Sequence, residues 1–207
     1  MKLRPRLAVA ALAALALPLY AFARAQDPTN PADPRNYDMA AMMKKWKEVC
    51  TPNANHQKLA RFVGKWETES GMSMELGAEP VKTKGSAEIE WLYEGRWLIE
   101  RSEGSMMGMP MKTVTISGYD NFKKKYVSTV VNSTTTGLLH AEGNFDASGK
   151  NLITYGLMDE PMTGEHDKTV RYVTRFLDAD TFVFEVHDLA IGEKDNKVIE
   201  VTYKRKK

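Results

Sequence analysis

The amino-acid sequence predicts an all-β fold: an antiparallel barrel of roughly ten strands with a short N-terminal helical segment. From Phe62 onward the chain divides into about ten short segments in which apolar and polar residues alternate. Turn-forming stretches such as YEGR, YDNF, DASGK and DADT separate these segments. Alternation with a period of two gives each strand one apolar and one charged face, which is typical of a single sheet curled around its own interior. Closure into a barrel also removes exposed strand edges.

Residues 1–25 have the features of a secretory signal peptide. They begin with the basic stretch MKLRPR, continue with an apolar run from Leu7 to about Leu19, and end with Ala23-Arg24-Ala25, an A-x-A cleavage site. The alternative is a transmembrane anchor. Such a span needs about 20 uninterrupted apolar residues, whereas this run is shorter and contains Pro18. We therefore expect export, to the periplasm or the medium, after cleavage near Ala25.

Cleavage would change the charge of the protein. The whole sequence has 29 Lys and Arg against 27 Asp and Glu, a net charge of +2. Residues 1–25 hold four of the basic side chains and no acidic one, so the mature chain would have a net charge of about −2. This balance gives no support for a nucleic-acid or anionic-membrane partner. The single cysteine, Cys50, excludes an internal disulfide; we expect it to be buried, with intermolecular pairing as the alternative.

The segment before the barrel divides into two parts. Residues 26–35 contain three prolines and no apolar periodicity, which predicts a flexible lead-in. Residues 36–61 are predicted to be helical, because their apolar residues recur at the spacing of one helix face. These are Met39, Met42, Met43, Trp46, Val49 and Cys50.

Residues 62–207 are predicted to form the barrel domain. Its strands are expected at 62–74, 81–92, 96–105, 111–119, 125–133, 137–145, 151–158, 168–177, 181–188 and 197–205. The alternation assigns faces: on 181–188, for example, Phe182 and Phe184 share one face, while Glu185 and His187 take the other.

Several motifs carry a family resemblance. LARFVGKWETE places Gly64-x-Trp66 at the start of the first strand after a short helix, as in lipocalin-like (calycin) barrels. GYDNFKKKYVSTVVNSTTTG, EGNFDASGK, DEPMTGE and VIEVTYKRKK follow in order. Together these motifs resemble a bacterial family of secreted, lipocalin-like domains of unknown function, from about Met39 to the C-terminus. The resemblance implies a calycin-type β-barrel and supplies no catalytic residues.

Lipocalin-like barrels commonly hold a small apolar ligand, so the resemblance predicts a small apolar or amphipathic molecule in the interior. The predicted lining is Trp66, Ile89, Trp91, Trp97, Tyr172, Phe182 and Phe184. Arg101 shares a face with Trp97 and is the predicted polar anchor, suited to a carboxylate or phosphate. Alternatively, Arg101 packs on Trp66 or a bulge turns it outward. In a filled barrel the lining would be core only, and the protein would act structurally or through protein contacts.

Three polar groups are further candidates. His140 and Glu142 share a strand face and could form an acid–base pair or bind a metal; their more apolar opposite face predicts that they point outward, and His187 beside Glu185 is assigned outward in the same way. A loop rich in acidic residues could hold a divalent cation or be an ordinary strand connection. Its members are Asp159, Glu160, Glu165, His166 and Asp167.

Methionine is the unusual component of the composition, with 12 in the sequence. Six of them form two groups in the sequence: Met72 and Met74, and then Met106, Met107, Met109 and Met111. Thioethers are soft ligands that select Cu(I), so a copper-binding module is one hypothesis. The other is that flexible methionines line the mouth of an apolar site.

No enzyme signature is present: the sequence lacks G-x-S-x-G, H-E-x-x-H, a P-loop and a dinucleotide fingerprint. No cofactor is predicted, although an enzyme of unknown reaction in the barrel remains an alternative. Lys123-Lys124-Lys125 is predicted to be the solvated tip of a hairpin, with an anion-binding patch as the alternative.

Overall fold

The structure is a computed structural model that describes residues 38–73, 79–93, 95–161, 163–189 and 196–207. The predicted signal peptide and lead-in, residues 1–25 and 26–35, lie outside the described residues. The chain divides into two units, with the boundary between Cys50 and Thr51. In the described part of the chain, no helix has the length and apolar character needed to cross a membrane.

In the first unit the structure describes one helix, α2 (Met39–Cys50). Asp38 begins it, because its Oδ1 accepts hydrogen bonds from the backbone N–H of Ala40 and Ala41 at 2.9 and 3.1 Å. All residues of α2 are exposed, including Trp46 on its apolar face. Cys50 is also exposed, so its predicted burial is wrong. A single helix cannot bury its own apolar stripe.

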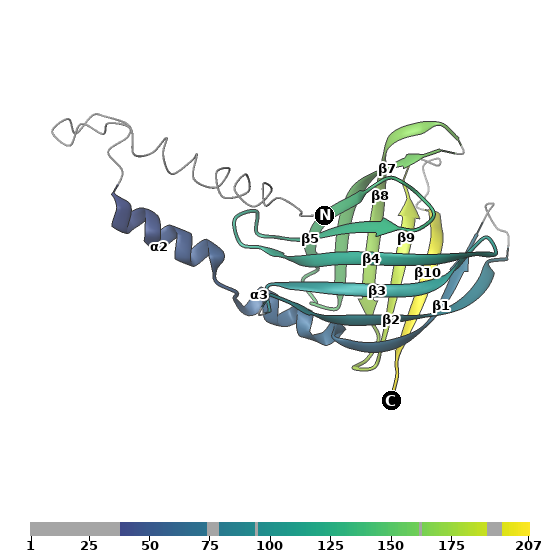
Figure 1. The fold of residues 1–207 in the computed structure, drawn as a ribbon, viewed down its shortest axis with the longest axis horizontal. Helices are drawn as coiled ribbons and strands as arrows, with labels where there is room; N and C mark the ends of the chain where they lie inside the picture. The colour runs from purple at the N-terminus through teal and green to yellow at the C-terminus, as the bar shows by residue number, and fades with distance from the viewer. Residues whose placement is uncertain (1–37, 74–78, 94, 162, 190–195) are drawn as a thin grey trace, which may run out of the picture. The chain divides into compact units, whose positions relative to one another are not determined.

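The second unit is a closed barrel of ten antiparallel strands, as predicted (Figure 1). The strands are β1 (Gly64–Met72), β2 (Val81–Leu92), β3 (Trp97–Met106), β4 (Met109–Asp120), β5 (Lys125–Asn132), β6 (Leu139–Phe145), β7 (Asn151–Glu160), β8 (Glu165–Phe176), β9 (Thr181–Asp188) and β10 (Asn196–Arg205). Each strand pairs with the next along the chain, and β1 pairs with β10 to close the sheet. Closure leaves no strand of this sheet with an unpaired edge.

The register determines which residues face the interior, because directly paired residues lie on the same face of a sheet. Trp91 on β2 pairs with Leu98 on β3, Leu98 with Ser117, Ser117 with Ser128, and Ser128 with Ala141. Leu98 and Ala141 are buried, so this whole row faces inward.

One end of the barrel is closed by the segment that precedes β1. Helix α3 (Ala54–Gln57) begins at Asn53 with a capping box, in which the Asn53 side chain accepts from Asn55 N–H and His56 Nδ1 accepts from Asn53 N–H. The 3₁₀ turn η1 (Lys58–Phe62) follows directly. Leu59 on η1 is almost fully buried in the hydrophobic core. This short helical segment is therefore part of the barrel unit.

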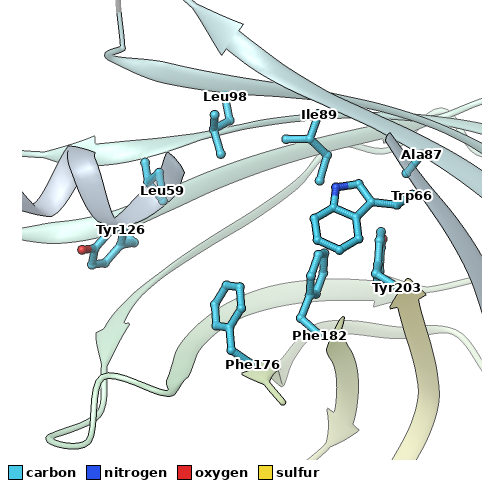
Figure 2. Close-up of a cluster of buried hydrophobic side chains, with 9 residues drawn as sticks. All are labelled: Leu59, Trp66, Ala87, Ile89, Leu98, Tyr126, Phe176, Phe182 and Tyr203. Atoms are coloured by element: carbon cyan, nitrogen blue, oxygen red, sulfur yellow. The ribbon is translucent and has the colours of Figure 1, made fainter. Parts of the chain in front are cut away.

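The closed end is filled by aromatic side chains (Figure 2). Phe182 packs edge-on against Trp66 at 4.8 Å and stacks on Tyr203 at 4.3 Å between ring centroids. Trp66 Nε1 donates to the Phe62 carbonyl at 2.8 Å, which ties the core to η1. Arg205, near the end of the chain, lies over the Trp66 ring and donates to the Val63 carbonyl at 2.7 Å. The two ends of the barrel sequence thus meet at this core.

Candidate functional site

Beyond this core, several inward-facing residues of the barrel remain in contact with solvent, although others, such as Val170, Thr174 and Val186, are buried. Seven inward-facing residues show this contact: Thr68, Ser102, Thr115, Ser117, Ser128, Tyr172 and Phe184. Each is half-buried, whereas Trp66, Phe182 and Leu98 are almost fully buried. Inward-facing side chains of a closed barrel can contact solvent only through the interior. We call the region lined by these seven residues the open interior.

A polar contact crosses the barrel where the core meets the open interior. Glu100 on β3 faces inward, paired with Ile89 on one side and Thr115 on the other. The Tyr203 hydroxyl on β10 donates to Glu100 Oε1 at 3.0 Å. Because β1 and β2 lie between these strands in the sheet, the hydrogen bond spans the interior.

Burial affects the protonation of both partners. It raises the pKa of Glu100, because an ionised carboxylate loses its hydration there, and the hydrogen bond from Tyr203 opposes part of that rise. Burial and the adjacent Glu100 raise the pKa of Tyr203 well above its ordinary value. Tyr203 therefore remains a hydrogen-bond donor at any ordinary pH, while Glu100 retains its proton more readily than an exposed glutamate.

A buried ion pair also faces the interior. Lys168 on β8 and Asp188 on β9 are both buried, and Lys168 Nζ lies 2.5 Å from Asp188 Oδ2. Glu165 Oε2 is a second partner of the same ammonium at 3.3 Å. The hydrogen bond with Asp188 raises the pKa of Lys168. The positive charge of Lys168 is thus neutralised within the protein.

The predicted site residues fall into three groups: those in the filled core, those that are inward and half-buried, and those that face outward. Trp66, Ile89 and Phe182 face inward but belong to the filled core. Three others face inward and are half-buried: Trp91, Tyr172 and Phe184. Tyr172 and Phe184 stack at 6.0 Å with an interplanar angle of 12°.

The inward orientation predicted for Trp97 and Arg101 is wrong. Arg101 is exposed and pairs with Glu90 at 2.9 Å on the outer face. Trp97 covers Gly118, where an added Cβ would lie 2.4 Å from the indole ring. Residues alternate along β3, so Leu98, Glu100 and Ser102 take the interior instead. The stretch WLIERS has apolar residues on both faces of the strand, so its alternation indicates the inward face only weakly. The inward position of Glu100 is not predicted from it.

Comparison with known proteins assigns the barrel to a family. The family model described as "Protein of unknown function (DUF1579)" matches residues 51–205. The chain belongs to the DUF1579 family. This match covers α3, η1 and all ten strands of the DUF1579 barrel. No curated protein matches the chain.

Two solved structures resemble the DUF1579 barrel. Rv2717c from M. tuberculosis is 11% identical, with a TM-score of 0.52, over 76% of this chain and 100% of that one. A redesigned β-barrel is 10% identical, with a TM-score of 0.38, over 72% of this chain and 96% of that one. At such low identity, the likeness to Rv2717c shows the fold alone.

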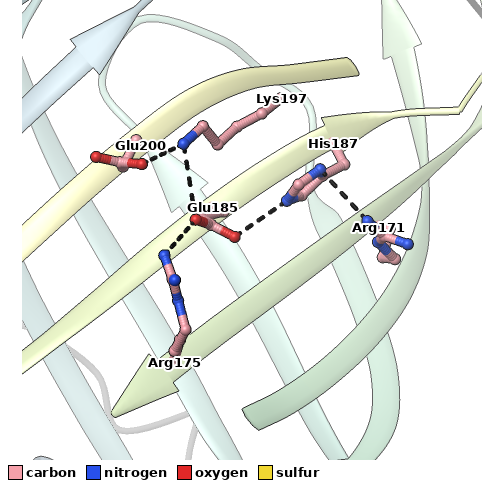
Figure 3. A network of polar contacts seen from close by, with 6 residues as sticks. All are labelled: Arg171, Arg175, Glu185, His187, Lys197 and Glu200. Atoms are coloured by element: carbon pink, nitrogen blue, oxygen red, sulfur yellow. Dashed lines mark hydrogen bonds and ion pairs between the residues drawn. The ribbon is translucent and has the colours of Figure 1, made fainter. Parts of the chain in front are cut away.

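A second polar cluster lies on the outer face of the DUF1579 barrel, around Glu185 (Figure 3). Arg175 Nη2 donates to Glu185 Oε1 at 2.7 Å, and His187 Nε2 lies 3.2 Å from Oε2. Lys197 contacts both Glu185 and Glu200, and Arg171 lies 3.4 Å from His187 Nδ1. Glu185 and His187 point outward, as predicted. Arg175, Lys197 and the His187 ring surround a nearly buried carboxylate, which accounts for the cluster as a structural network that compensates its charge.

The lysine run lies in the β4–β5 hairpin of the DUF1579 barrel, as predicted. Asp120 Oδ1 accepts from the Lys123 N–H at 2.9 Å, and Lys124 adopts a positive φ of 57°. Lys123 and Lys125 both bind Glu142, and these hydrogen bonds lower the pKa of Glu142 to about 2. Both carboxylate oxygens of Glu142 are therefore already bound by lysine side chains. His140 also points outward and contacts Thr129 at 3.2 Å.

The remaining candidates of the DUF1579 barrel are dispersed. In the acidic loop, His166 lies 3.2 Å from Asp159, while Glu165 binds Lys168. Among the described residues, no three His, Cys, Asp or Glu side chains are grouped to hold a metal ion. Met106 and Met109 pair across the β3–β4 turn, whereas Met74 lies outside the described residues.

A shallow hollow of about 130 Å³ lies on the outer face of β1 and β10 of the DUF1579 barrel, bounded by charged residues such as Glu69, Lys82 and Glu200. Sites for drug-sized ligands usually enclose about 300 Å³ or more. We therefore do not assign a ligand to this hollow.

Proposed function

We propose that the DUF1579 barrel binds a small amphipathic molecule in its open interior. The observation that carries this proposal is the contrast within the barrel: the closed end is filled, while the seven residues of the open interior retain contact with solvent. An interior of this kind suits a ligand, because burying a molecule there removes exposed apolar surface without rebuilding the core.

The lining offers surfaces for both parts of such a molecule. Trp91, Tyr172 and Phe184 supply aromatic surface. Hydroxyl groups of inward-facing serines and threonines, together with the Glu100–Tyr203 pair, supply hydrogen-bonding groups. An apolar body with one polar group matches this combination better than a purely apolar molecule would.

The proposal is tested by filling the interior. Ser128 on β5 faces inward, whereas the adjacent Thr129 faces outward. We would titrate the neutral fluorescent probe N-phenyl-1-naphthylamine into wild type, Ser128→Leu and Thr129→Leu, after checking each fold by circular dichroism. We expect Ser128→Leu to weaken binding by at least about tenfold and Thr129→Leu to leave it unchanged. No binding to wild type, or equal binding to all three, would overturn the proposal.

We also infer that the protein is exported and that its barrel is of the calycin type. The signal-peptide features of residues 1–25 support export. The closed antiparallel barrel, with Gly64 opening β1 and Trp66 buried in its core, supports the calycin type. N-terminal sequencing of the native protein tests export: a mature N-terminus near residue 26 is expected, and an intact residue 1 on native protein would contradict it.

A Cu(I)-binding module is a second candidate, favoured by the direct pairing of Met106 with Met109 beside the exposed Met107. Titration of Cu(I) into wild type and into a variant with leucine at positions 106, 107, 109 and 111 tests it. Loss of binding in the variant is expected from this hypothesis, and unchanged affinity eliminates it.

A further inference from the structure

We propose that the open interior selects amphipathic molecules whose polar group donates hydrogen bonds, with primary amines preferred over carboxylates, and that Glu100 sets this preference. This inference rests on the function proposed above and adds the chemical class of the ligand. The prediction based on Arg101 was the opposite, because an inward arginine would have selected an anion.

The first step is the position of Glu100. Its carboxyl group lies at the floor of the open interior, next to the core residue Ile89 and the half-buried Thr115. Tyr203 donates to Oε1. In the described part of the chain, Oε2 makes no hydrogen bond to the protein. One carboxyl oxygen is therefore available to a donor group on a ligand.

The second step is the charge of the interior. Among the described residues that face it, the charged side chains are Glu100, Asp188 and Lys168, and Tyr172 is a further titratable group. Lys168 is already paired with Asp188 and with Glu165. Arg101, on the same strand as Glu100, points to the outer face and pairs with Glu90. Among the described residues that face the interior, no uncompensated positive charge thus awaits an anionic ligand.

The third step is the energetics of each ligand class. An ammonium group beside Glu100 would supply the opposite charge that the buried carboxylate lacks, so each would reduce the cost of burying the other. A hydroxyl group would donate to Oε2 without a charge. A carboxylate would have to lie near Glu100 and Asp188 with no cation to compensate it. We therefore expect the order amine, then alcohol, then carboxylate.

The inference also predicts how ligand binding depends on pH. Tyr203 is the titratable group that faces Glu100, and the flanking Ile89 and Thr115 do not titrate. Burial favours the protonated carboxyl group of Glu100, whereas a bound ammonium favours the carboxylate. Amine binding should release a proton from Glu100 to solvent and become stronger as pH rises through the pKa of Glu100. Alcohol binding should show no such release.

The test is competition against N-phenyl-1-naphthylamine by decylamine, decanol and decanoate, each below its micellar concentration. For wild type near pH 7 we expect decylamine to compete at least about tenfold better than decanoate. In Glu100→Gln, decylamine should fall to within about twofold of decanol. The matched control is Glu103→Gln on the same strand, which removes an exposed outer carboxylate paired with Lys112 and should leave the order unchanged.

A second variant covers the case in which Glu100→Gln does not fold. Tyr203→Phe removes the hydroxyl that stabilises the carboxylate, so the pH at which decylamine binding strengthens should move upward. An unchanged pH midpoint contradicts the role of Glu100.

The two proposals fail in different ways. Absent probe binding, or equal binding to Ser128→Leu, overturns ligand binding itself. Probe binding with decanoate competing as well as decylamine, or an amine preference that survives in Glu100→Gln, overturns only the assignment of ligand class.

Discussion

Tyr203 on the last strand and Glu100 on the third strand are joined by a 3.0 Å hydrogen bond across the barrel interior. On one side of this bond, Tyr203 stacks on Phe182 within the aromatic core. On the other side lies the open interior, whose seven lining residues are half-buried. The pair therefore separates the part of the barrel that maintains the fold from the part that we assign to a ligand.

Replacing Glu100 by Gln should make stability depend less on pH. Burial raises the pKa of Glu100 above its ordinary 4.5. Between pH 4.5 and the raised pKa, the folded state therefore binds more protons than the unfolded state. The free energy of unfolding of wild type falls by up to about 1.4 kcal/mol per pH unit in this range. Gln retains an oxygen for Tyr203 and carries no charge.

Urea unfolding between about pH 4 and pH 8 measures this effect. Glu100→Gln should gain stability relative to wild type as pH rises above 4.5. A difference that stays constant over the range would show that Glu100 is not destabilised by burial. Glu103→Gln is the control, because its carboxylate is exposed.

Truncation of two phenylalanines on the same face of β9 should have unequal costs. Phe182 is buried among Trp66, Phe176 and Tyr203, so Phe182→Ala should destabilise the barrel by about 3–5 kcal/mol. Phe184 is half-buried and borders the open interior. Water can enter the space left there, so Phe184→Ala should cost less than about half as much. Equal costs in urea unfolding would mean that the interior is filled throughout.

Gly156 should be intolerant of a side chain. A Cβ at this position would lie 2.2 Å from the His140 carbonyl oxygen on the neighbouring strand. The backbone would have to move, so Gly156→Ala should cost about 1–3 kcal/mol. Gly104→Ala is the matched control within a strand, because nothing lies within 4 Å of its added Cβ. Thermal unfolding should separate the two variants; similar melting temperatures would refute the close approach of β6 and β7.

The pKa of Glu142 should depend on the lysines that bind it. Hydrogen bonds from Lys123 and Lys125 lower it to about 2. Since this pKa lies below the ordinary 4.5, the stabilising contribution is present above that pH and is lost as pH falls towards 2. In Lys123→Met, carboxyl ¹³C chemical shifts should report a higher pKa. Lys124→Met should not change it, because Lys124 occupies the turn with a positive φ.

Periodicity was sufficient to predict the barrel and many of its strand faces. On β9, the apolar Phe182, Phe184 and Val186 alternate with Glu185 and His187, and the structure places the two sets on opposite faces. Turn residues such as Asp120 also marked the hairpins correctly, because their side chains cap the turn backbone.

The candidate site was harder to predict because β3 has apolar residues on both faces. Trp97 and Ile99 outweigh Leu98 in a pattern count, so the pattern predicts Arg101 to face inward and does not single out Glu100. The pairing of Ile89 with Glu100 reverses this assignment. A shift of one residue exchanges every side chain between faces. Here the shift places the acidic Glu100 inward and the basic Arg101 outward. Contacts between distant strands, such as Glu100 with Tyr203, have no local sequence signal.

The most direct test of the account is native mass spectrometry of the protein purified without denaturant from its own host. We predict that wild type carries a small bound molecule with an amine or hydroxyl group, and that Ser128→Leu, prepared identically, carries none. Thr129→Leu should retain the molecule, because its side chain faces outward. An unliganded mass for all three proteins, together with no binding of N-phenyl-1-naphthylamine, would contradict a ligand-binding interior.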